Sequence, residues 1–247
     1  MNEEMSYKLK FNLILIKNES RKWNLKVEKK VVAFVPIKLN SQRLPHKNIL
    51  PLGEHSLSWY IFNTLLQIEQ IDEVCVFCSD EKVMEYLPKG VRFVKRDSRL
   101  NGDLVKGHEI YEAFINTIDS DIYLLAHTTS PFMSETSVRN ALINVLSENY
   151  DSALSVIKKQ TFVWYKGETL NYKLDDIPRT QDIEPVYIET SGFFIFKKDH
   201  FLTHGQRIGF LPYFQELDDI EAIDIDTKED YEFALRIIEP NKLLQEI

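Results

Sequence analysis

Residues 31–48 read VVAFVPIKLNSQRLPHKN, and this stretch is the strongest indicator of the fold class. Val31 to Val35 form an unbroken apolar run that Pro36 closes. Such a run of β-branched and aromatic side chains is typical of a strand that is buried on both faces of a parallel sheet. In open α/β sheets, ligands bind at the carboxyl ends of the strands. We therefore expect the loop that follows Val35 to line a binding site.

The loop from Val35 to Asn48 is rich in groups that suit a polyphosphate. It carries three cations, Lys38, Arg43 and Lys47. Cations and backbone N–H groups together bind phosphate oxygens. The small polar residues beside these cations are Asn40, Ser41 and Asn48. Composition alone leaves a solvated surface loop with ordinary basic residues open as the alternative.

Size and charge narrow the class of protein. The chain has 247 residues, of which 44% are hydrophobic, and this suffices for one α/β domain with a sizeable core. Its net charge of −8 argues against a general nucleic-acid surface, because such surfaces need an excess of Lys and Arg. No apolar run approaches the roughly 18 residues that span a bilayer, and no signal-like region is evident. We expect a cytoplasmic protein that binds neither nucleic acid nor membrane.

The two cysteines, Cys75 and Cys78, form a C-x-x-C pattern in the segment EVCVFCSD. A redox pair or half of a zinc site would fit this spacing. The pattern lies inside an apolar, strand-like run rather than at a helix start, and the sequence contains no further cysteine. Because free cysteine is often buried, we expect both thiols to be part of the core.

Strand-like and helix-like segments alternate along residues 31–159. The apolar strand patterns lie at 31–35, 73–78, 91–95, 122–126 and 151–158, and the helix-period segments lie at 57–68, 108–118 and 134–149. This alternation predicts a three-layer, doubly wound, mostly parallel α/β sheet of the Rossmann-like type. The rhythm breaks over residues 160–191, where we expect a β-rich insertion within a domain of residues 31–247. Residues 1–30 form an N-terminal extension whose alternating segments fit a β-hairpin.

The loop resembles the signature loop of the acylneuraminate cytidylyltransferases, the CMP-sugar synthetases that activate 2-keto sugar acids such as sialic acids. The pattern of that loop runs I-P-A-R-x-G-S-x-R-L-P-x-K-N. The chain departs from it at Lys38, where arginine is usual, and at Leu39-Asn40, where glycines are usual. Lys38 keeps the charge but loses the planar fork of arginine. The matching residues are Pro36, Ser41, Arg43, Leu44, Pro45, Lys47 and Asn48.

A second stretch, HTTSP at residues 127–131, is similar to the L-Q-P-T-S-P motif of the same family. It follows the apolar strand pattern at 122–126. Thr129 and Ser130 match the motif directly, and the resemblance implies that they contact the nucleotide. His127 replaces the glutamine, and we expect it to face the sugar. A lone histidine is more often a hydrogen-bonded structural residue, which is the alternative.

Two further strand ends carry polar residues. Ser79 and Asp80 follow the strand pattern at 73–78, and Arg96 follows the one at 91–95. The resemblance places these three residues beside the nucleotide. For Ser79 and Asp80, a plain helix N-cap is an equal alternative.

The insertion contains the residues that the resemblance assigns to the sugar. Arg179 and Gln181 resemble an R-x-Q segment of the family, and Glu189, Thr190 and Ser191 lie where it usually has N-G before a strand. The resemblance implies that this insertion forms part of the acceptor pocket and a contact between the subunits of a homodimer. An arginine here could pair with a sugar carboxylate. A solvated turn is the alternative for each residue.

Two acids near the C-terminus form the last signal, in the segment EAIDIDTKED. Asp224 and Asp226 are two positions apart in a predicted strand, so their side chains share one face. Adjacent carboxylates repel each other unless a cation neutralises them, and hard divalent ions prefer oxygen ligands. Asp226-Thr227 could alternatively cap the next helix. In the resembling family, this D-I-D-x-x-x-D element, with Asp230 as its third acid, holds Mg²⁺, for which Mn²⁺ can substitute.

The resemblance covers roughly residues 31–240 and implies a CTP-dependent nucleotidyltransferase. Its substrates would be CTP and an acidic 2-keto sugar of the sialic-acid type, whose anomeric hydroxyl receives CMP while pyrophosphate leaves. The catalytic residues would be three cations and two acids, namely Lys38, Arg43, Lys47, Asp224 and Asp226.

Three alternatives stay open. The acceptor could be 3-deoxy-manno-octulosonate or a pseudaminate-type acid. The chain could be a CTP-binding protein without turnover, although such a module has little reason to keep a close pair of acids. A nucleotide-sugar glycosyltransferase is a weaker option, because its D-x-D motif would follow a central strand.

Overall fold

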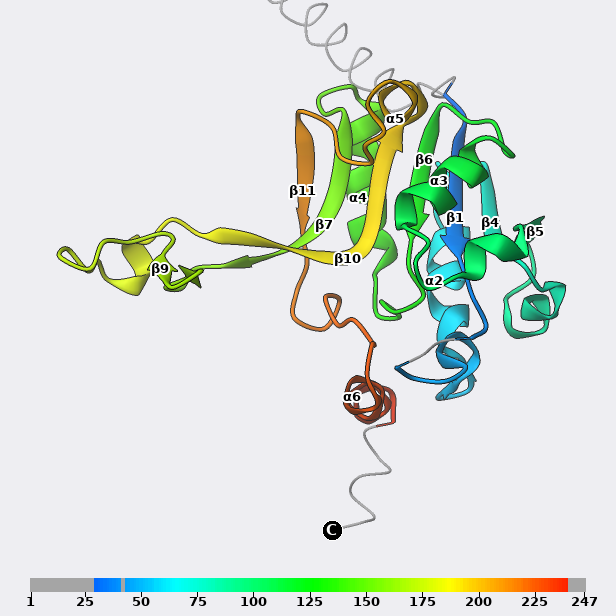
Figure 1. Ribbon diagram of the computed structural model, residues 1–247, viewed down its shortest axis with the longest axis horizontal. Coiled ribbons are helices and arrows are strands. Elements are labelled where there is room, and N and C mark those ends of the chain that lie inside the picture. Colours follow the sequence, from blue (N-terminus) through cyan, green and yellow to red (C-terminus); the bar gives the residue numbers. More distant parts are fainter. Residues whose placement is uncertain (1–28, 41–42, 240–247) are drawn as a thin grey trace, which may run out of the picture.

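The computed structural model describes residues 29–40 and 43–239. A seven-stranded sheet with the order β11-β7-β10-β6-β1-β4-β5 forms its centre (Figure 1). β10 is antiparallel to both of its neighbours, and all other pairings in this sheet are parallel. The predicted mostly parallel sheet is therefore confirmed. Its strands are β1 (Val31–Pro36), β4 (Glu73–Cys78), β5 (Arg92–Lys95), β6 (Ile122–Ala126), β7 (Ser152–Lys159), β10 (Val186–Lys197) and β11 (Pro212–Glu216).

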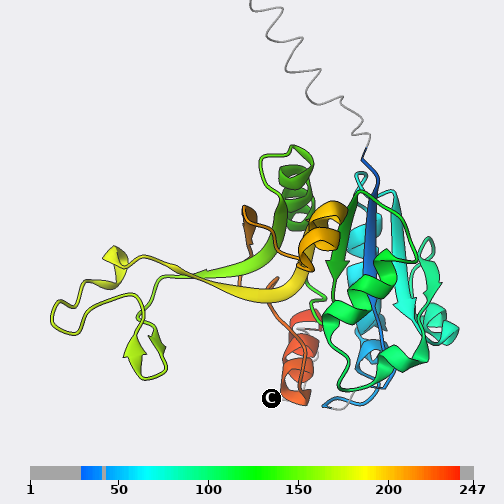
Figure 2. The ribbon, with the colours of Figure 1, turned by 45° about the horizontal axis from the view of Figure 1, so that its top comes forward.

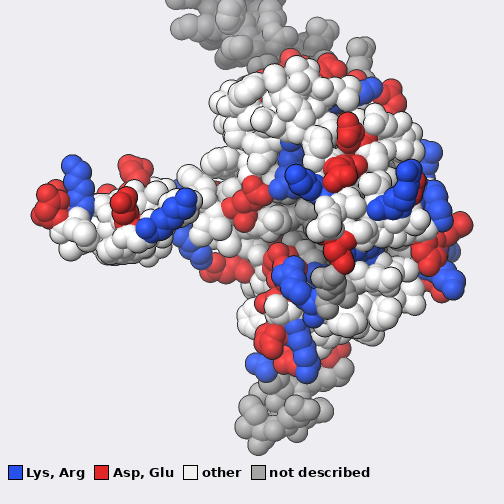
Figure 3. Space-filling view, viewed as in Figure 1, with Lys and Arg blue, Asp and Glu red and all other residues white. Residues whose placement is uncertain are grey.

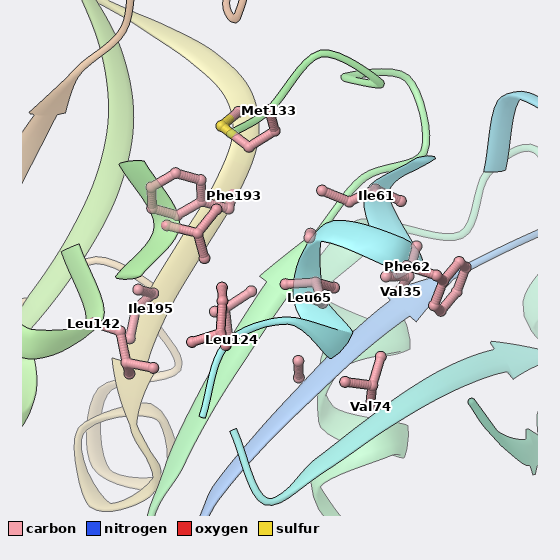
Figure 4. Close-up of a cluster of buried hydrophobic side chains, with 14 of the residues drawn as sticks. Val35, Ile61, Phe62, Leu65, Val74, Leu124, Met133, Leu142, Phe193 and Ile195 are labelled. Atoms are coloured by element: carbon pink, nitrogen blue, oxygen red, sulfur yellow. The ribbon is translucent and has the colours of Figure 1, made fainter. Parts of the chain in front are cut away.

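Helices cover both faces of the sheet, as the alternation predicted. α2 (Leu57–Leu66) and α4 (Glu135–Leu146) pack on one face, and α3 (Gly107–Ile115) and α5 (Lys198–His204) pack on the other. Figure 4 shows side chains of α2 lying among those of β1, β4 and β6. Each fully buried aliphatic or aromatic side chain contributes about 1.5–3 kcal/mol of transfer free energy. The two apolar faces of β1 therefore anchor the loop that follows it.

A third, smaller core brings the C-terminal part of the domain beside that loop. α6 (Lys228–Ile238) contributes Ala234, the preceding segment contributes Ile225, and both pack with Leu52 and Leu57. The short elements are β2 (Pro51–Leu52), β3 (His55–Ser56), β8 (Trp164–Tyr165), β9 (Glu168–Thr169) and the 3-10 helices η1 (Lys47–Ile49), η2 (Glu81–Tyr86), η3 (Ser98–Asn101) and η4 (Thr180–Asp182).

The two cysteines belong to the core, and they do not form a redox pair. Both are free and buried, and they lie on opposite faces of β4, with Cys75 in the cluster under α3 and Cys78 in the cluster under α2 and α4. Burial raises the pKa of Cys75 to about 12 and raises that of Cys78 as well. The prediction that both thiols are structural is confirmed.

Residues 160–185 form an arm that projects from the body between β7 and β10 (Figures 1 and 2). The arm holds the short β8–β9 hairpin and η4, and the rest of residues 160–185 lies outside helices and strands. β10 already pairs with β7 from Val186 onward, and its register shifts between Glu189 and Phe194, where Ser191 has a φ of 59°. Large apolar side chains stay exposed along the arm and its base, namely Phe162, Trp164, Tyr165, Leu170, Leu174, Ile177, Tyr187 and Ile188.

Two further predictions concern the membrane and the N-terminal extension. No helix within 29–40 and 43–239 is both long and apolar enough to cross a membrane. The hairpin predicted for residues 1–30 lies outside the described part of the chain, apart from Lys29 and Lys30.

Candidate active site

A pocket of about 450 Å³ opens at the carboxyl ends of β1 and β6. The loop after β1 forms one wall, residues 127–129 after β6 form another, and Asp226 closes a third side. This is the edge at which the sequence predicted a binding site. The lining residues are Pro36, Lys38, Arg43, Leu44, Lys47, Asn48, Asp103, His127, Thr128, Thr129 and Asp226.

Two cations of the loop converge on one carboxylate across this pocket. Lys47 Nζ lies 2.8 Å from Asp226 Oδ1, and Arg43 Nη2 lies 2.8 Å from Asp226 Oδ2. Partial burial raises the pKa of Asp226, but the hydrogen bonds and charges of Lys47 and Arg43 outweigh it, and the pKa lies below its ordinary value. The structure thus brings together residues that are 179 positions apart in the sequence.

Asp224 lies beside this cluster in a more buried place. Burial raises its pKa, the nearby charge of Asp226 adds to this effect, and a hydrogen bond with the Thr129 side chain opposes it. Its Oδ1 atom is buried and has no hydrogen-bond partner among the described residues. Asp224 is not among the residues that line the pocket, although it interacts with Thr129 and Asp226, which do line it.

The predicted strand around Asp224 and Asp226 is wrong. Residues 223–226 are not part of any strand; the amide of Ile225 donates one hydrogen bond to the Thr129 carbonyl at 2.8 Å. Thr129 lies in the turn after β6, so it cannot continue a ladder. The buried side chain of Ile225 still fixes the segment, and Thr227 rather than Asp226 caps α6. The Asp230 carboxylate accepts hydrogen bonds from the backbone amides of Asp226 and Thr227 and so fixes the backbone of this segment.

Lys38 and Asn48 hold the loop in place. Lys38 Nζ lies 3.0 Å from Asp103 Oδ1. The backbone carbonyl of Lys38 accepts a hydrogen bond from Asn48 Nδ2 at 2.8 Å. Asn48 Oδ1 accepts from the Thr128 hydroxyl at 2.6 Å. Asn48 thus ties the β1 loop to the β6 end. Asn40 is exposed and does not line the pocket, and Ser41 lies outside the described residues.

A second pocket, of about 290 Å³, adjoins the first and shares Lys38, Asp103 and His127 with it. Arg96 lines it and is only 2% exposed. Its Nη2 donates to Asn101 Oδ1 at 2.7 Å, and burial lowers the pKa of Arg96. Within the described part of the chain, its buried Nε has no hydrogen-bond partner. Asn101 in turn donates to the Ser79 hydroxyl at 2.7 Å. Asp80 is exposed and accepts from the Lys82 amide at 3.0 Å, so it caps η2.

His127 lies between the two pockets and is held by the β10 bulge. Its Nδ1 contacts the carbonyl of Ser191, and its amide donates to the Gly192 carbonyl at 3.1 Å. A carbonyl can only accept, so Nδ1 carries the proton and Nε2 is an acceptor. Burial lowers the pKa of His127, and the imidazole is therefore neutral near pH 7.

Three of the predicted contact residues have their side chains or backbone directed into the protein. The Thr190 hydroxyl donates to Ser155 Oγ at 2.7 Å, and Ser191 supplies its carbonyl to His127. Ser130 is buried and lines neither of these pockets. A Cβ atom at Gly192 would lie 2.4 Å from Met133 Cε and 3.1 Å from Ser155 Oγ, so β10 packs closely on this turn. Thr190, Ser191 and Ser130 therefore support the site without lining either pocket.

Arg179 and Gln181 belong to the arm, which projects from the body (Figure 1), and neither residue lines either pocket of the same chain. Arg179 Nε pairs with Asp182 at 2.7 Å, and the Gln181 carbonyl accepts from Gln160 at 2.8 Å. On the face seen in Figure 3, basic and acidic side chains are interleaved and do not form one continuous basic patch.

Sequence reasoning missed two residues next to these pockets. Asn101 sits in an N-G pair that reads as an ordinary turn, although its amide bridges Arg96 and Ser79. Arg207 lies between two glycines in GQRIG and donates to Glu189, a predicted sugar residue, at 2.9 Å. No local motif marks either residue, because the contacts with Ser79 and Glu189 form only in the folded chain.

Solved structures share this fold. A CMP:2-keto-3-deoxy-manno-octonic acid synthetase complexed with CTP is 14% identical and aligns with a TM-score of 0.63 over 88% of this chain and 100% of its own. A 4-diphosphocytidyl-2C-methyl-D-erythritol synthase from Anaerococcus prevotii is 15% identical, with a TM-score of 0.59 over 88% of this chain and 96% of its own. At this identity the likeness concerns the fold.

Curated relatives carry the name that the signature loop predicted. The N-acylneuraminate cytidylyltransferase of Streptococcus agalactiae is 21% identical over 82% of this chain and 52% of its own length. That of Escherichia coli O18:K1:H7 is 26% identical over 84% of this chain and 52% of its own. The chain thus spans about half the length of these relatives. The sequence profile of the cytidylyltransferase family matches residues 32–246, and the chain belongs to that family.

Proposed function

We propose that this protein transfers CMP from CTP to the anomeric hydroxyl of a 2-keto sugar acid of the sialic-acid type and releases pyrophosphate. One observation carries the proposal: Arg43 and Lys47 meet Asp226 beside the partnerless oxygen of Asp224, at the carboxyl ends of β1 and β6. Cations and acids in one pocket suit a metal-bound triphosphate. Family membership supports the same reaction.

The residues of the first pocket would bind the triphosphate. Phosphate oxygens can replace the Asp226 carboxylate on Arg43 and Lys47, and Lys38 can exchange Asp103 for phosphate in the same way. The acceptor oxygen forms a bond to the α-phosphorus and releases its proton to water, while the bond between the α-phosphorus and the leaving pyrophosphate oxygen breaks. Placement in line and charge neutralisation account for most of the rate of such transfers.

Asp224 and Asp226 would hold a Mg²⁺ ion, or Mn²⁺ in its place. The described residues contain no group of three or more His, Cys, Asp or Glu side chains that could enclose a metal. Two carboxylates nevertheless fit Mg²⁺, because this ion is usually bound by one or two carboxylates together with water and substrate phosphates. The buried, partnerless Oδ1 of Asp224 fits such a ligand. When bound, the ion would neutralise charge on the phosphates.

The second pocket would hold the nucleoside and the acceptor. The buried Nε–H of Arg96 is an unused donor at its wall, and a nucleobase carbonyl could accept from it. Neutral His127, with Nε2 as an acceptor, could accept a hydrogen bond from a hydroxyl group of either substrate. His127 then orients a substrate and contributes no charge.

The arm would complete the site of a second subunit in a homodimer. The arm carries several large apolar side chains that are exposed, among them Trp164 at 55% and Leu174 at 64%. Large exposed apolar patches on a protein often mark an interface with another chain. Arg179 and Gln181 lie on this arm and not at their own pocket. Light scattering should therefore show two chains per particle.

A pyrophosphate-release assay tests the proposed reaction. The full chain is incubated with each of four nucleoside triphosphates and a panel of N-acylneuraminic, 3-deoxy-manno-octulosonic and pseudaminic-type acids. We expect release with CTP only, and fastest release with an N-acylneuraminic acid. Preference for another acid would change the acceptor. CTP binding without release for any acid would instead indicate a non-catalytic nucleotide-binding protein.

A further inference from the structure

A third polar cluster lies at the base of the arm, on the side of α3. Arg207, in the loop between α5 and β11, donates through Nη1 to the Tyr111 hydroxyl and through Nη2 to Glu189 Oε1, both at 2.9 Å. Tyr111 belongs to α3 and Glu189 to β10. The cluster thus joins three segments that are distant in the sequence, and the triphosphate pocket uses none of them.

The Arg207 guanidinium is held in a fixed plane. Its central carbon lies 3.6 Å from the centre of the Phe194 ring and 5.7 Å from that of Tyr111. Stacking on aromatic faces favours a planar guanidinium over a lysine ammonium. A Cβ atom at Gly107 would lie 2.7 Å from the Tyr111 hydroxyl, so this glycine lets Tyr111 reach its position. The fork of Arg207 is therefore preorganised.

Arg207 is adjacent to the second pocket and accessible from solvent. It lines a cavity of about 350 Å³ that shares Gly107 and Tyr111 with the second pocket. The Phe194 ring that carries Arg207 also contacts His127, with 6.2 Å between ring centres. The Arg207 side chain is 28% exposed, whereas Arg96 in the second pocket is 2% exposed. The second pocket and the cavity at Arg207 therefore adjoin each other at Gly107 and Tyr111.

The charge of this cluster matches an anionic acceptor. Arg207 already binds one carboxylate, that of Glu189, which is 38% exposed. In the proposed reaction Lys38, Arg43 and Lys47 are committed to the triphosphate, which leaves Arg207 as an accessible guanidinium of this chain on the acceptor side. An arginine fork suits a planar carboxylate better than any other side chain does.

We propose that Arg207 binds the carboxylate of the acceptor acid, and that Glu189 is the internal carboxylate which this substrate replaces. The inference rests on the proposed CMP transfer and assigns acid recognition to the chain that also holds the triphosphate. Glu189 then acts as a competitor of the substrate for Arg207.

Steady-state kinetics of Arg207→Met test this assignment. Methionine keeps the apolar contact with Phe194 but removes the charge. Because hydrogen bonds to charged groups contribute about 1.5–3 kcal/mol, we expect the KM for the acid to rise about 10- to 100-fold and the KM for CTP to change less than about threefold. Arg207→Lys should recover part of the loss. Arg139→Met, at an arginine paired with Glu135 on α4, is the matched control and should leave both KM values unchanged.

An acceptor whose carboxylate is esterified separates recognition from a structural role. The wild-type protein should prefer the free acid over its methyl ester, and Arg207→Met should accept both about equally. Glu189→Gln keeps a hydrogen-bond acceptor for Arg207 but removes the competing charge, so we expect the KM for the acid to fall about three- to tenfold. An unchanged acid-to-ester preference in Arg207→Met would overturn the assignment.

Binding measured without turnover distinguishes this inference from the proposed reaction. Saturation-transfer NMR can follow the acid in the presence of a CTP analogue with a methylene bridge between its α- and β-phosphates. If the wild-type protein binds the acid but Arg207→Met does not, the inference holds even if no pyrophosphate is ever released. Equal binding by both proteins, or no binding by the wild type, contradicts it.

Discussion

The pocket and the arm differ in two respects: how far apart in the sequence their paired charges lie, and whether their apolar side chains are buried. In the pocket, Lys47 and Asp226 pair across 179 positions, and an apolar core beneath them fixes both elements. On the arm, Arg179 pairs with Asp182, three positions away, while Trp164 and Leu174 stay exposed. The body therefore explains its own geometry, whereas the arm has apolar surface that the described residues leave exposed.

This difference predicts where a mutation acts on folding and where it acts on assembly. A residue of the body should affect the free energy of unfolding or the chemistry. A residue of the arm should affect the association of two chains with little change in the stability of one. The following experiments test that division, beginning with the largest expected effect.

Truncation of a core residue should show the largest effect. Phe193 is fully buried in β10 and packs in the cluster drawn in Figure 4, so Phe193→Ala should lower the free energy of unfolding by about 3–5 kcal/mol. Trp164→Ala, on the arm, should change it by less than about 0.5 kcal/mol at concentrations where the chain is monomeric. Urea denaturation measures both. A comparable loss in the two variants would abolish the distinction between body and arm.

Removal of one phosphate-binding cation should come next. Lys47→Met should lower kcat/KM by about 10²- to 10³-fold, because a preorganised charge at the transferring phosphoryl group is lost. The control is Lys159→Met, which removes a surface lysine paired with Asp219 at 2.7 Å and should leave the rate unchanged. Pyrophosphate release with CTP as the varied substrate provides the measurement. Equal rates for the two variants would remove Lys47 from the mechanism.

Mutations on the arm should weaken the association of two chains. Trp164→Ala combined with Leu170→Ala should weaken the dimer about 30-fold or more, since buried aromatic anchors at interfaces each contribute about 2 kcal/mol or more. Sedimentation across a range of concentrations measures the dissociation constant. Mixing Arg179→Ala chains with Lys47→Met chains should restore part of the activity, because each mixed dimer then contains one complete site. A monomeric wild type would contradict this use of the arm.

The two acids should titrate with opposite signs and with the smallest effect. Asp226 has a lowered pKa, so its stabilising contribution is present above the unfolded-state value near 3.9 and is lost as pH falls through the lower folded-state value. Asp224 has a raised pKa, so its contribution is present at low pH and is lost as pH rises through the folded-state value. At pH 7, Asp226→Asn should destabilise the fold by less than about 1 kcal/mol, and Asp224→Asn should stabilise it. Urea unfolding at several pH values checks both signs.

Much of the body could be predicted because its signals are local. The apolar runs of β1 and β6 are buried along their length, and the loop cations gather at the strand end as the parallel arrangement requires. The Asp224–Asp226 segment was predicted as a strand because its residues alternate. Alternation indicates which residues face the core, and Ile225 is indeed buried. A strand also needs a neighbouring strand for its backbone hydrogen bonds, and the turn at Thr129 accepts only one, from the Ile225 amide.

Other site residues could not be predicted, because tertiary contacts define them. Arg207 has no motif of its own and gains a role only where α3 and β10 approach its loop. Thr190 and Ser130 carry hydroxyl groups that suit a ligand, yet Thr190 donates to Ser155 and Ser130 is buried outside both pockets. A resemblance transfers residue types and order, and it does not transfer which side chains line the pocket.

Calorimetric titration of CTP, with and without Mg²⁺, tests the central claim most directly. If the basic loop and the acid pair form one site for a metal-bound triphosphate, Mg²⁺ should strengthen CTP binding to the wild-type protein. Asp224→Asn should lose that strengthening while keeping the wild-type affinity in the absence of Mg²⁺. An undiminished Mg²⁺ effect in Asp224→Asn would contradict the account.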